Sequence, residues 1–428
     1  MVAAGRGVRP LARRLYAYAL FDELIPLYPL YAVIFADHGL SGGQISSLFV
    51  LWSAVVFLLE IPSGAWADTF SRRTMLTVGP VLSGAGFALW TFLPSYPAFA
   101  AGFVLWGLQS ATRSGTLESL VYDALARLDA TASYPRLASR SRAIGLTAGL
   151  VATAAATPLF ALGGYSLVGG VSVASCLLMA VVGARFPVPP ARPPGPPGPD
   201  GELPEPAGGL SGPDGESEDE TDASGGYLAM LRSGLAESIS SPPVRQVVLL
   251  TAALGGMLAI DEYFPLLATS VGAGPSKVPL LVLLPSLGTV VGALAAARYA
   301  AAHRNGLAVV IGTGAVALGV GSALAHPTGF VLIAIGYGLI QLALVVAEVR
   351  LQDRIDGPAR ATVTSVAGFG ADVVAVLMYT SYGLGSVVLD PAAALAVLAL
   401  PPFGIAVVLA ASGPHRRLRR PRWSRSRK

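Results

Sequence analysis

Long apolar segments recur along the chain and alternate with short polar stretches. Twelve of them are about 20 residues long, the length that an α-helix needs to cross the hydrocarbon core of a membrane. They cover residues 15–35, 44–65, 74–94, 98–121, 143–163, 166–185, 246–268, 278–297, 307–325, 329–348, 362–383 and 391–411. The pattern therefore predicts an all-α integral membrane protein with twelve transmembrane helices.

The first apolar segment follows an arginine-rich start, an arrangement that also occurs in secretory signals. This segment is longer than a signal core, lacks a cleavage-like end and contains Asp22 and Glu23. We therefore expect it to be retained as the first membrane helix.

The composition changes completely between the sixth and seventh segments, over residues 187–242. The beginning of this stretch is proline-rich and its middle is acidic, so it cannot bury a core and is predicted to be a disordered cytoplasmic linker with a short helix at its end. A solvated linker is favoured over a regulatory acidic segment. The linker divides the chain into six-helix halves at 1–186 and 243–412, followed by a basic cytoplasmic tail at 413–428.

Positive charge falls in alternate loops. The loops after helices 1, 3, 5, 9 and 11 contain no Lys or Arg, and the loop after helix 7 contains only Lys277. The loops after helices 2, 4, 8 and 10 contain Arg72, Arg73, Arg127, Arg136, Arg140, Arg142, Arg298, Arg304, Arg350, Arg354 and Arg360. The positive-inside rule then predicts a multi-pass protein of the cell membrane with both termini in the cytoplasm. Because the basic tail follows a membrane helix, we expect it to bind anionic lipids and not nucleic acid.

The composition supports the membrane assignment and excludes several chemistries. Of the 428 residues, 53% are hydrophobic and 13% are charged, whereas soluble proteins carry about 25% charged residues. Cys176 is the single cysteine and the four histidines form no ligand motif, so no metal site or cofactor is expected. There is no phosphate-binding G-x-x-x-x-G-K motif and no Ser/His/Asp cluster, so neither an enzyme nor an ATP-driven pump is supported.

The two halves carry matching motifs. Helices 4 and 10 both end in E-x-x-x-x-D, at Glu118–Asp123 and Glu348–Asp353, 230 residues apart. Helices 2 and 8 end in similar small-residue motifs, which begin at Gly64 and Gly292, 228 residues apart. Such repeats are typical of transporters built from two related halves.

A third likeness has a different spacing. The motif D-E-x-x-P-L begins at Asp22 in helix 1 and at Asp261 in helix 7, 239 residues apart. Because this offset differs from the other two, we interpret the likeness as coincidental. Asp261 and Glu262 are then expected near the outer vestibule or external gate, and Asp22 and Glu23 near the middle of helix 1.

Residues 60–73 read E-I-P-S-G-A-W-A-D-T-F-S-R-R. This stretch resembles the signature loop between helices 2 and 3 of the major facilitator superfamily, with Gly64, Asp68, Ser71, Arg72 and Arg73 in register. Thr69 replaces the basic residue that the family carries after the aspartate. Residues 113–123 and 353–366 are also similar to bacterial members. The resemblance implies two pseudo-symmetric six-helix bundles that work by alternating access.

The resemblance also implies an inner gate, in which Asp68 and the arginines pair with acids of helix 4, Asp123 being the expected partner. The candidate gate residues are Glu60, Gly64, Asp68, Arg72, Arg73, Glu118, Asp123, Glu348 and Asp353. In the second half, Ala296 replaces the aspartate, so we expect a weaker latch in which Glu348 and Asp353 face Arg298 or Arg304.

Ionisable side chains inside a membrane helix call for a functional or structural reason, because each costs about 2.5–3.5 kcal/mol on insertion scales. The candidates for transport and proton coupling are Asp22, Glu23, Arg113, Asp261, Glu262 and Asp372. Adjacent helical residues point about 100° apart, so Asp22 and Glu23 cannot both face one way. They suit proton or substrate binding, or else a polar contact between helices.

The other two candidates also leave alternatives open. Arg113 is expected to pair with Asp22 or Glu23, in a motor role or a structural one. Asp372 is expected either to line the cavity or to contact the end of helix 2.

Together these features favour a secondary active transporter of a small organic molecule, driven by protons and most simply an efflux antiporter. A proton-coupled symporter for nutrient uptake is the alternative, and a non-transporting membrane sensor is less favoured. The expected partners are the substrate, protons and membrane lipids, and we expect a monomer.

Overall fold

The computed structural model describes residues 4–69, 71–113, 115–187, 242–299, 304–355 and 360–411, with the side chains of all but 4–6, 60–69, 304, 360 and 361. Within these ranges the regular structure is helical. Nearly all of the predicted linker and all of the basic tail lie outside the described residues.

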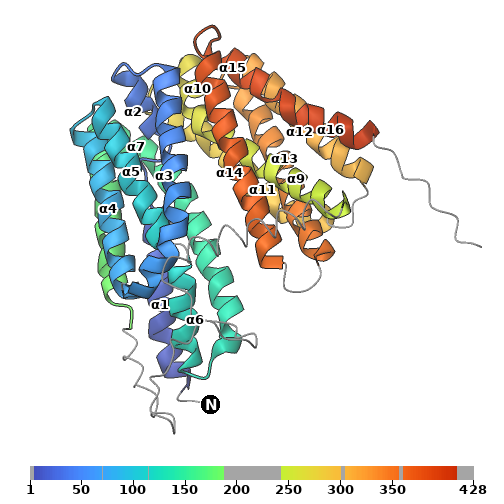
Figure 1. Ribbon diagram of the computed structural model, residues 1–428. Helices are drawn as coiled ribbons and strands as arrows, with labels where there is room; N and C mark the ends of the chain where they lie inside the picture. The colour runs from blue at the N-terminus through green and yellow to red at the C-terminus, as the bar shows by residue number, and fades with distance from the viewer. Residues whose placement is uncertain are drawn as a thin grey trace, which may run out of the picture.

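Two groups of helices lie side by side, one from each half of the chain (Figure 1). The N-terminal bundle contains α1 (Ala4–Glu23), α2 (Tyr31–Asp37), α3 (Gly42–Thr69), α4 (Arg72–Phe92), α5 (Tyr96–Arg113), α6 (Thr116–Ala126), the 3₁₀ helix η1 (Thr131–Ser133) and α7 (Tyr134–Ala184). The C-terminal bundle contains α9 (Pro242–Met257), the 3₁₀ helix η2 (Leu258–Tyr263), α10 (Phe264–Ser270), α11 (Val278–Tyr299), α12 (Arg304–Ala323), α13 (Gly329–Arg354), α14 (Arg360–Gly385), α15 (Pro391–Leu398) and α16 (Leu400–Ala411).

Nine stretches of the described residues are long and apolar enough to cross a membrane. One of them contains α7, whose 51 residues would be far too long for one span at about 1.5 Å per residue. The backbone of α7 leaves the helical conformation at Gly163 and Gly164, where Gly164 has a φ of 59°, and the chain turns back there. Thus α7 supplies the fifth and sixth spans, and the fifth begins at Tyr134, nine residues before the predicted start.

The first and fourth predicted spans are missing from these nine because each is divided. The predicted helix 15–35 separates into α1 and α2 around Pro26 and Pro29, since proline lacks an N–H donor and disfavours helix before it. The predicted helix 98–121 separates into α5 and α6, where Gly115 adopts a φ of 67° that favours glycine. Counting these two spans and the second half of α7 restores the twelve predicted crossings.

The seventh span is also divided, into α9, η2 and α10. Backbone groups freed by an interruption need new partners in a membrane. The Tyr337 hydroxyl donates to the Leu258 carbonyl at 2.7 Å, and at the first interruption the Ser172 hydroxyl accepts from the Leu27 N–H at 3.1 Å. These side chains stabilise irregular backbone at the ends of α9 and α1.

The interpretation of the two D-E-x-x-P-L motifs as coincidental is wrong, because the offset between the halves is not constant. Helices α1 and α9 begin 238 residues apart, at Ala4 and Pro242, whereas α7 and α14 begin only 226 apart, at Tyr134 and Arg360. The connections between helices therefore differ in length between the halves. Both motifs lie at the interruption of the first span of their bundle.

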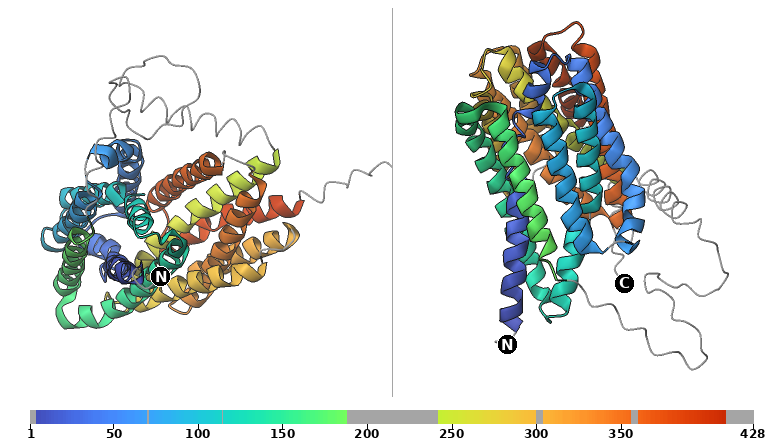
Figure 2. Two further views of the ribbon diagram at one scale, coloured as in Figure 1. Left: turned by 90° about the horizontal axis from the view of Figure 1, so that it is seen from below. Right: turned by 90° about the vertical axis from the view of Figure 1, so that its left-hand side faces the viewer.

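The bundles touch at the end of the molecule that holds α2, the start of α3, α10 and the end of α14, which we call the closed end (Figure 1). There the Ser46 and Tyr263 hydroxyls are 2.8 Å apart. The Phe49 ring lies 5.5 Å from the Tyr263 ring, and a Cβ on Gly43 would meet the Gly383 carbonyl at 3.5 Å. At the opposite end, which holds the start of α1 and α6, the two bundles diverge (Figures 1 and 2).

Candidate substrate cavity and gates

A cavity of about 560 Å³ lies between the two bundles. The N-terminal bundle contributes residues from the α1–α2 interruption, α5 and α7, and the C-terminal bundle contributes residues from η2, α10, α11 and α13. The interruptions in the first, fourth and seventh spans all reach this cavity or its immediate edge. Irregular backbone near the middle of a membrane is typical of transporter binding sites.

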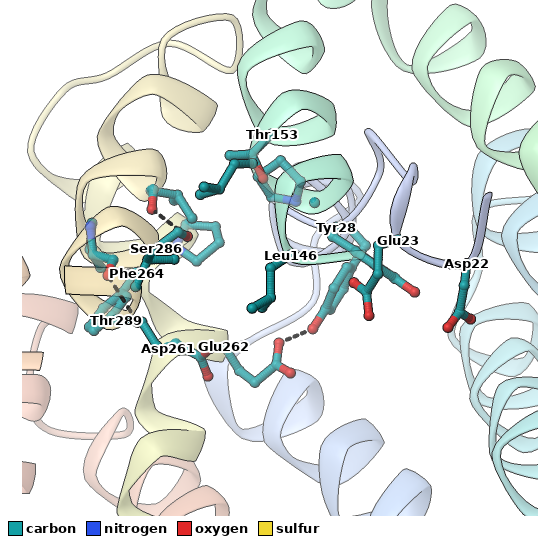
Figure 3. Close-up of a pocket in the computed structure, with 18 of the residues that line it drawn as sticks. Asp22, Glu23, Tyr28, Leu146, Thr153, Asp261, Glu262, Phe264, Ser286 and Thr289 are labelled. Carbon is teal, nitrogen blue, oxygen red and sulfur yellow. Dashed lines mark hydrogen bonds between the residues drawn. The ribbon is translucent and has the colours of Figure 1, made fainter. Parts of the chain in front are cut away.

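Both acidic pairs line this one cavity. Asp22 and Glu23 belong to one wall and Asp261 and Glu262 to the other, with Leu146 between them (Figure 3). The expectation that Asp261 and Glu262 face an outer vestibule is therefore corrected, since the fixed offset on which it rested does not hold.

Arg113 is the last residue of α5 and forms an ion pair with Asp22 at 2.6 Å. This contact decides between the two partners that the sequence left open. Glu23, the next residue, lies against the small surface of α7, where a Cβ on Gly145 would be 3.3 Å from the Glu23 side chain. Of the two neighbours, Asp22 is thus held by a counterion while Glu23 faces the cavity.

The acids of the C-terminal bundle have neutral partners. The Tyr31 hydroxyl of α2 donates a hydrogen bond to Glu262, which joins the two bundles across the cavity (Figure 3). Asp261 interacts with the hydroxyl of Tyr337, the same group that holds the Leu258 carbonyl. Glu262 is therefore both a cavity residue and a contact of the closed end.

Aromatic rings and one amide complete the wall of the N-terminal bundle. The rings of Tyr28 and Trp106 stack with centroids 5.6 Å apart, and the Trp52 ring stacks 5.0 Å from Trp106 on its own side. Gln109, one turn further along α5, lines the cavity although its side chain is only 5% exposed.

A second cavity of about 390 Å³ extends from the first inside the N-terminal bundle. It shares Asp22, Glu23, Arg113 and Leu146 with the central cavity. Its remaining lining comes from α1, α6 and the start of α7, so it leads toward the end opposite the closed end. The carboxyl groups of α1 are thus reached from that end.

The signature stretch is mostly helical, which corrects the expectation of a loop: α3 continues to Thr69, and the Ser71 hydroxyl caps α4 by accepting from the Thr74 N–H at 3.1 Å. Arg72 pairs with Asp123 of α6 at 2.5 Å. Both residues belong to the N-terminal bundle, so this pair does not itself connect the bundles. The side chains of Glu60 and Asp68, and any close contacts of Gly64, lie outside the described residues.

The remaining gate candidates are separated. Glu118 is exposed and lines the second cavity, and Arg73 is half-buried. Glu348 interacts electrostatically with Arg142 of the opposite bundle, and not with Arg298 as expected; the Arg304 side chain lies outside the described residues. Asp353 is exposed near the end of α13.

Asp372 of α14 is exposed and does not line the central cavity described above. Its expected contact with the end of helix 2 involves side chains outside the described residues.

With this geometry established, comparison with known proteins identifies the family. The family model described as Major Facilitator Superfamily matches residues 15–379. The chain belongs to the Major Facilitator Superfamily. No curated protein sequence matches the chain closely enough to count as a relative.

Solved structures of other superfamily-type transporters have the same fold. The nucleoside transporter NupG is 14% identical, with a TM-score of 0.63 and coverage of 94% of this chain and 98% of that one. A bacterial homologue of the human lysosomal transporter Spinster, in an inward-facing and unoccupied conformation, is 15% identical, with a TM-score of 0.63 and coverage of 96% and 95%. The peptide transporter POT is 14% identical, with a TM-score of 0.63 and coverage of 94% and 93%. The chain is thus a multi-pass membrane transporter of the secondary-transporter kind.

Sequence reasoning did not anticipate Tyr31, Trp106 or Tyr337. A signal for Tyr31 exists in the sequence, because it follows Pro26 and Pro29 and must begin a new helix. Nothing local marks Trp106 or Tyr337, which become site residues only when the two bundles are brought together.

Proposed function

We propose that this superfamily member couples the movement of a small organic molecule to protons, and that it works as an efflux antiporter. The observation that carries the proposal is the gathering of four carboxyl groups and one guanidinium around a single cavity between the bundles. Carboxyl groups so close together cannot all stay ionised without a cation nearby, so they are suited to exchange protons for another ligand.

The contacts at the closed end support alternating access. Tyr31–Glu262 and Ser46–Tyr263 join the bundles on one side of the cavity, and the second cavity leads away on the other. With both termini in the cytoplasm, this arrangement is an inward-facing state. Rocking of the bundles would break these contacts and bring Arg142 and Glu348 together at the opposite end.

Proton movement in proteoliposomes tests the proposal. A pH dye inside vesicles reports the response to a panel of small organic molecules, and empty vesicles serve as the control. We expect proton efflux from acid-loaded vesicles when a substrate is added outside.

The same assay separates the alternative. Acidification inside vesicles that start at equal pH would instead identify a symporter for uptake. Substrate flux by radiotracer without proton movement would contradict proton coupling, and silence in both assays would contradict transport.

A further inference from the structure

The central cavity has an excess of negative charge. Its lining includes four carboxyl groups and one guanidinium, and that guanidinium is already paired with Asp22. Removing one partner of a charge in a low-dielectric site is strongly unfavourable, so the remaining carboxylates attract a positive ligand and repel a negative one.

Among these carboxylates, Glu23 is the one left for a ligand. Glu262 accepts from Tyr31, and Asp261 interacts with Tyr337. No other residue in the described part of the chain donates a hydrogen bond to the Glu23 carboxylate. Gly145 and Gly149 on α7 leave room for its side chain, since a Cβ on Gly149 would lie 3.7 Å from its Oε2 atom.

The wall beside Glu23 is aromatic. Tyr28 and Trp106 form the stacked pair that lines the cavity, and Trp52 supports Trp106 from behind. The faces of tryptophan and tyrosine rings attract cations within about 6 Å and also pack against apolar groups. The wall therefore suits a ligand that is charged at one point and apolar elsewhere.

A second feature, independent of the acids, also points to a ligand. The Gln109 side chain is 95% buried, lines the cavity and has no hydrogen bond to another side chain or backbone group of the described residues. A buried amide without a partner is unfavourable, so such groups normally bind a ligand or water. Gln109 lies one helical turn from Arg113 and on the same wall as Trp106.

We propose that the central cavity binds a monovalent organic cation with an aromatic or aliphatic body, such as a substituted ammonium or phosphonium ion. Glu23 is its counterion, the Tyr28–Trp106 stack is its wall, and Gln109 is its polar contact. The cavity volume of about 560 Å³ lies in the usual range for small-molecule sites, which is about 300–1,000 Å³. The inference rests on the proposed function, because it names the substrate class of the same site.

Equilibrium dialysis of the purified full-length protein against tetraphenylphosphonium tests this inference. Tetraphenylborate has the same shape and the opposite charge, and it is measured in separate samples. We expect saturable binding of the phosphonium and none of the borate at pH 8. Binding of the borate alone, or no binding of the phosphonium to folded protein, would overturn the inference.

Two variants localise the binding. Glu23→Gln keeps the size of the side chain and removes its charge, so we expect at least about a tenfold loss of phosphonium affinity. Asp390→Asn is the matched control, because it removes a carboxylate at the N-cap of α15, outside the cavity, and asparagine caps helices equally well. Equal affinity of Glu23→Gln and the unaltered protein, with both folded by thermal unfolding, would refute the role of Glu23.

Failure of this inference is distinguishable from failure of the proposed function. Proton-coupled flux of neutral compounds, with no phosphonium binding, would overturn the cationic site and leave the transporter intact. Phosphonium binding without flux of any compound would leave the cationic site standing and contradict transport.

Discussion

Asp22 and Glu23 are neighbours in the chain, yet their surroundings differ. Because α1 is helical up to Glu23, the two side chains point in different directions: Asp22 toward Arg113 of α5 and Glu23 toward α7 and the cavity. The sequence analysis gave both acids the same candidate role. The structure gives one of them a counterion, so we expect their substitution to have different effects.

Asp22→Asn should lower stability and Glu23→Gln should lower transport. The first leaves Arg113 without its ion-pair partner, at a cost of about 1–3 kcal/mol because Arg113 remains partly exposed. The second should abolish gradient-driven transport and spare substrate exchange, because it removes a group that can take up and release a proton. Thermal unfolding and proteoliposome flux measure the two effects.

The double variant Asp22→Asn/Arg113→Gln is the control for this pair. It removes both charges and should recover much of the stability that Asp22→Asn loses. A Glu23→Gln protein that accumulates substrate against a gradient at the normal rate would contradict the coupling role.

The hydrogen bond between Tyr31 and Glu262 should hold the closed end together. Tyr31→Phe keeps the ring, which packs on Trp90 and Phe103, and loses only the hydroxyl. A hydrogen bond to a charged group contributes about 1.5–3 kcal/mol, so the population with a separated closed end should rise at least tenfold. Spin labels at the exposed positions His38 and Val388, in a Cys176→Ser background, would show this as a longer distance component.

Glu262→Gln is the milder control, because its amide oxygen still accepts from Tyr31. Distance distributions that are identical in the unaltered protein and Tyr31→Phe would show that the bond does not contribute to closure.

At the scale of helices, the interruptions position the site. Glu23 ends α1, Arg113 ends α5, and Asp261 and Glu262 lie in η2 between α9 and α10. A side chain at the end of a helix is placed by the point where that helix stops. The charges of the cavity are therefore positioned by prolines and glycines that themselves carry no charge.

Gly115 tests this dependence. Its φ of 67° is one that side chains with a Cβ rarely adopt, and no atom lies within 4 Å of a Cβ built there. Gly115→Ala should therefore cost about 1–2 kcal/mol through the backbone alone and displace Arg113. The expected result is a lower unfolding temperature and slower transport.

Gly115→Asn is the matched control, since asparagine tolerates the left-handed region better than other residues with a Cβ. If alanine and asparagine have equal effects, backbone conformation is not what Gly115 supplies.

Twelve crossings could be predicted from the sequence because apolar length alone defines them. The interruptions could be predicted only in part: Pro26 and Pro29 mark the first, whereas the breaks at Gly115 and in η2 have weaker local signals. The joint site could not be predicted, since the fixed offset between the halves placed Asp261 away from Asp22. Loop lengths decide that relation, and they change along the chain.

At the scale of the whole molecule, the cavity should be reached from one side of the membrane only. The positive-inside pattern predicts that this side is the cytoplasm. Ser286→Cys, inside the cavity, should react with an impermeant maleimide in inside-out vesicles, and Val388→Cys, 83% exposed at the closed end, should react only in right-side-out vesicles. The native Cys176 is 3% exposed and should stay unlabelled.

Substrate at saturating concentration should protect Ser286→Cys and leave Val388→Cys unaffected. Labelling of both positions from the same side would contradict the inward-facing assignment.

The charge count of the cavity has an electrical consequence. A cycle that exchanges one proton for one monovalent cation moves no net charge, so only the pH difference drives it. The three carboxyl groups without a guanidinium partner allow more than one proton to bind, and each extra proton makes the membrane voltage a driving force of about 2.3 kcal/mol per 100 mV. A potassium-valinomycin clamp would then change the transport rate, and the size of that change would give the number of protons carried in each cycle.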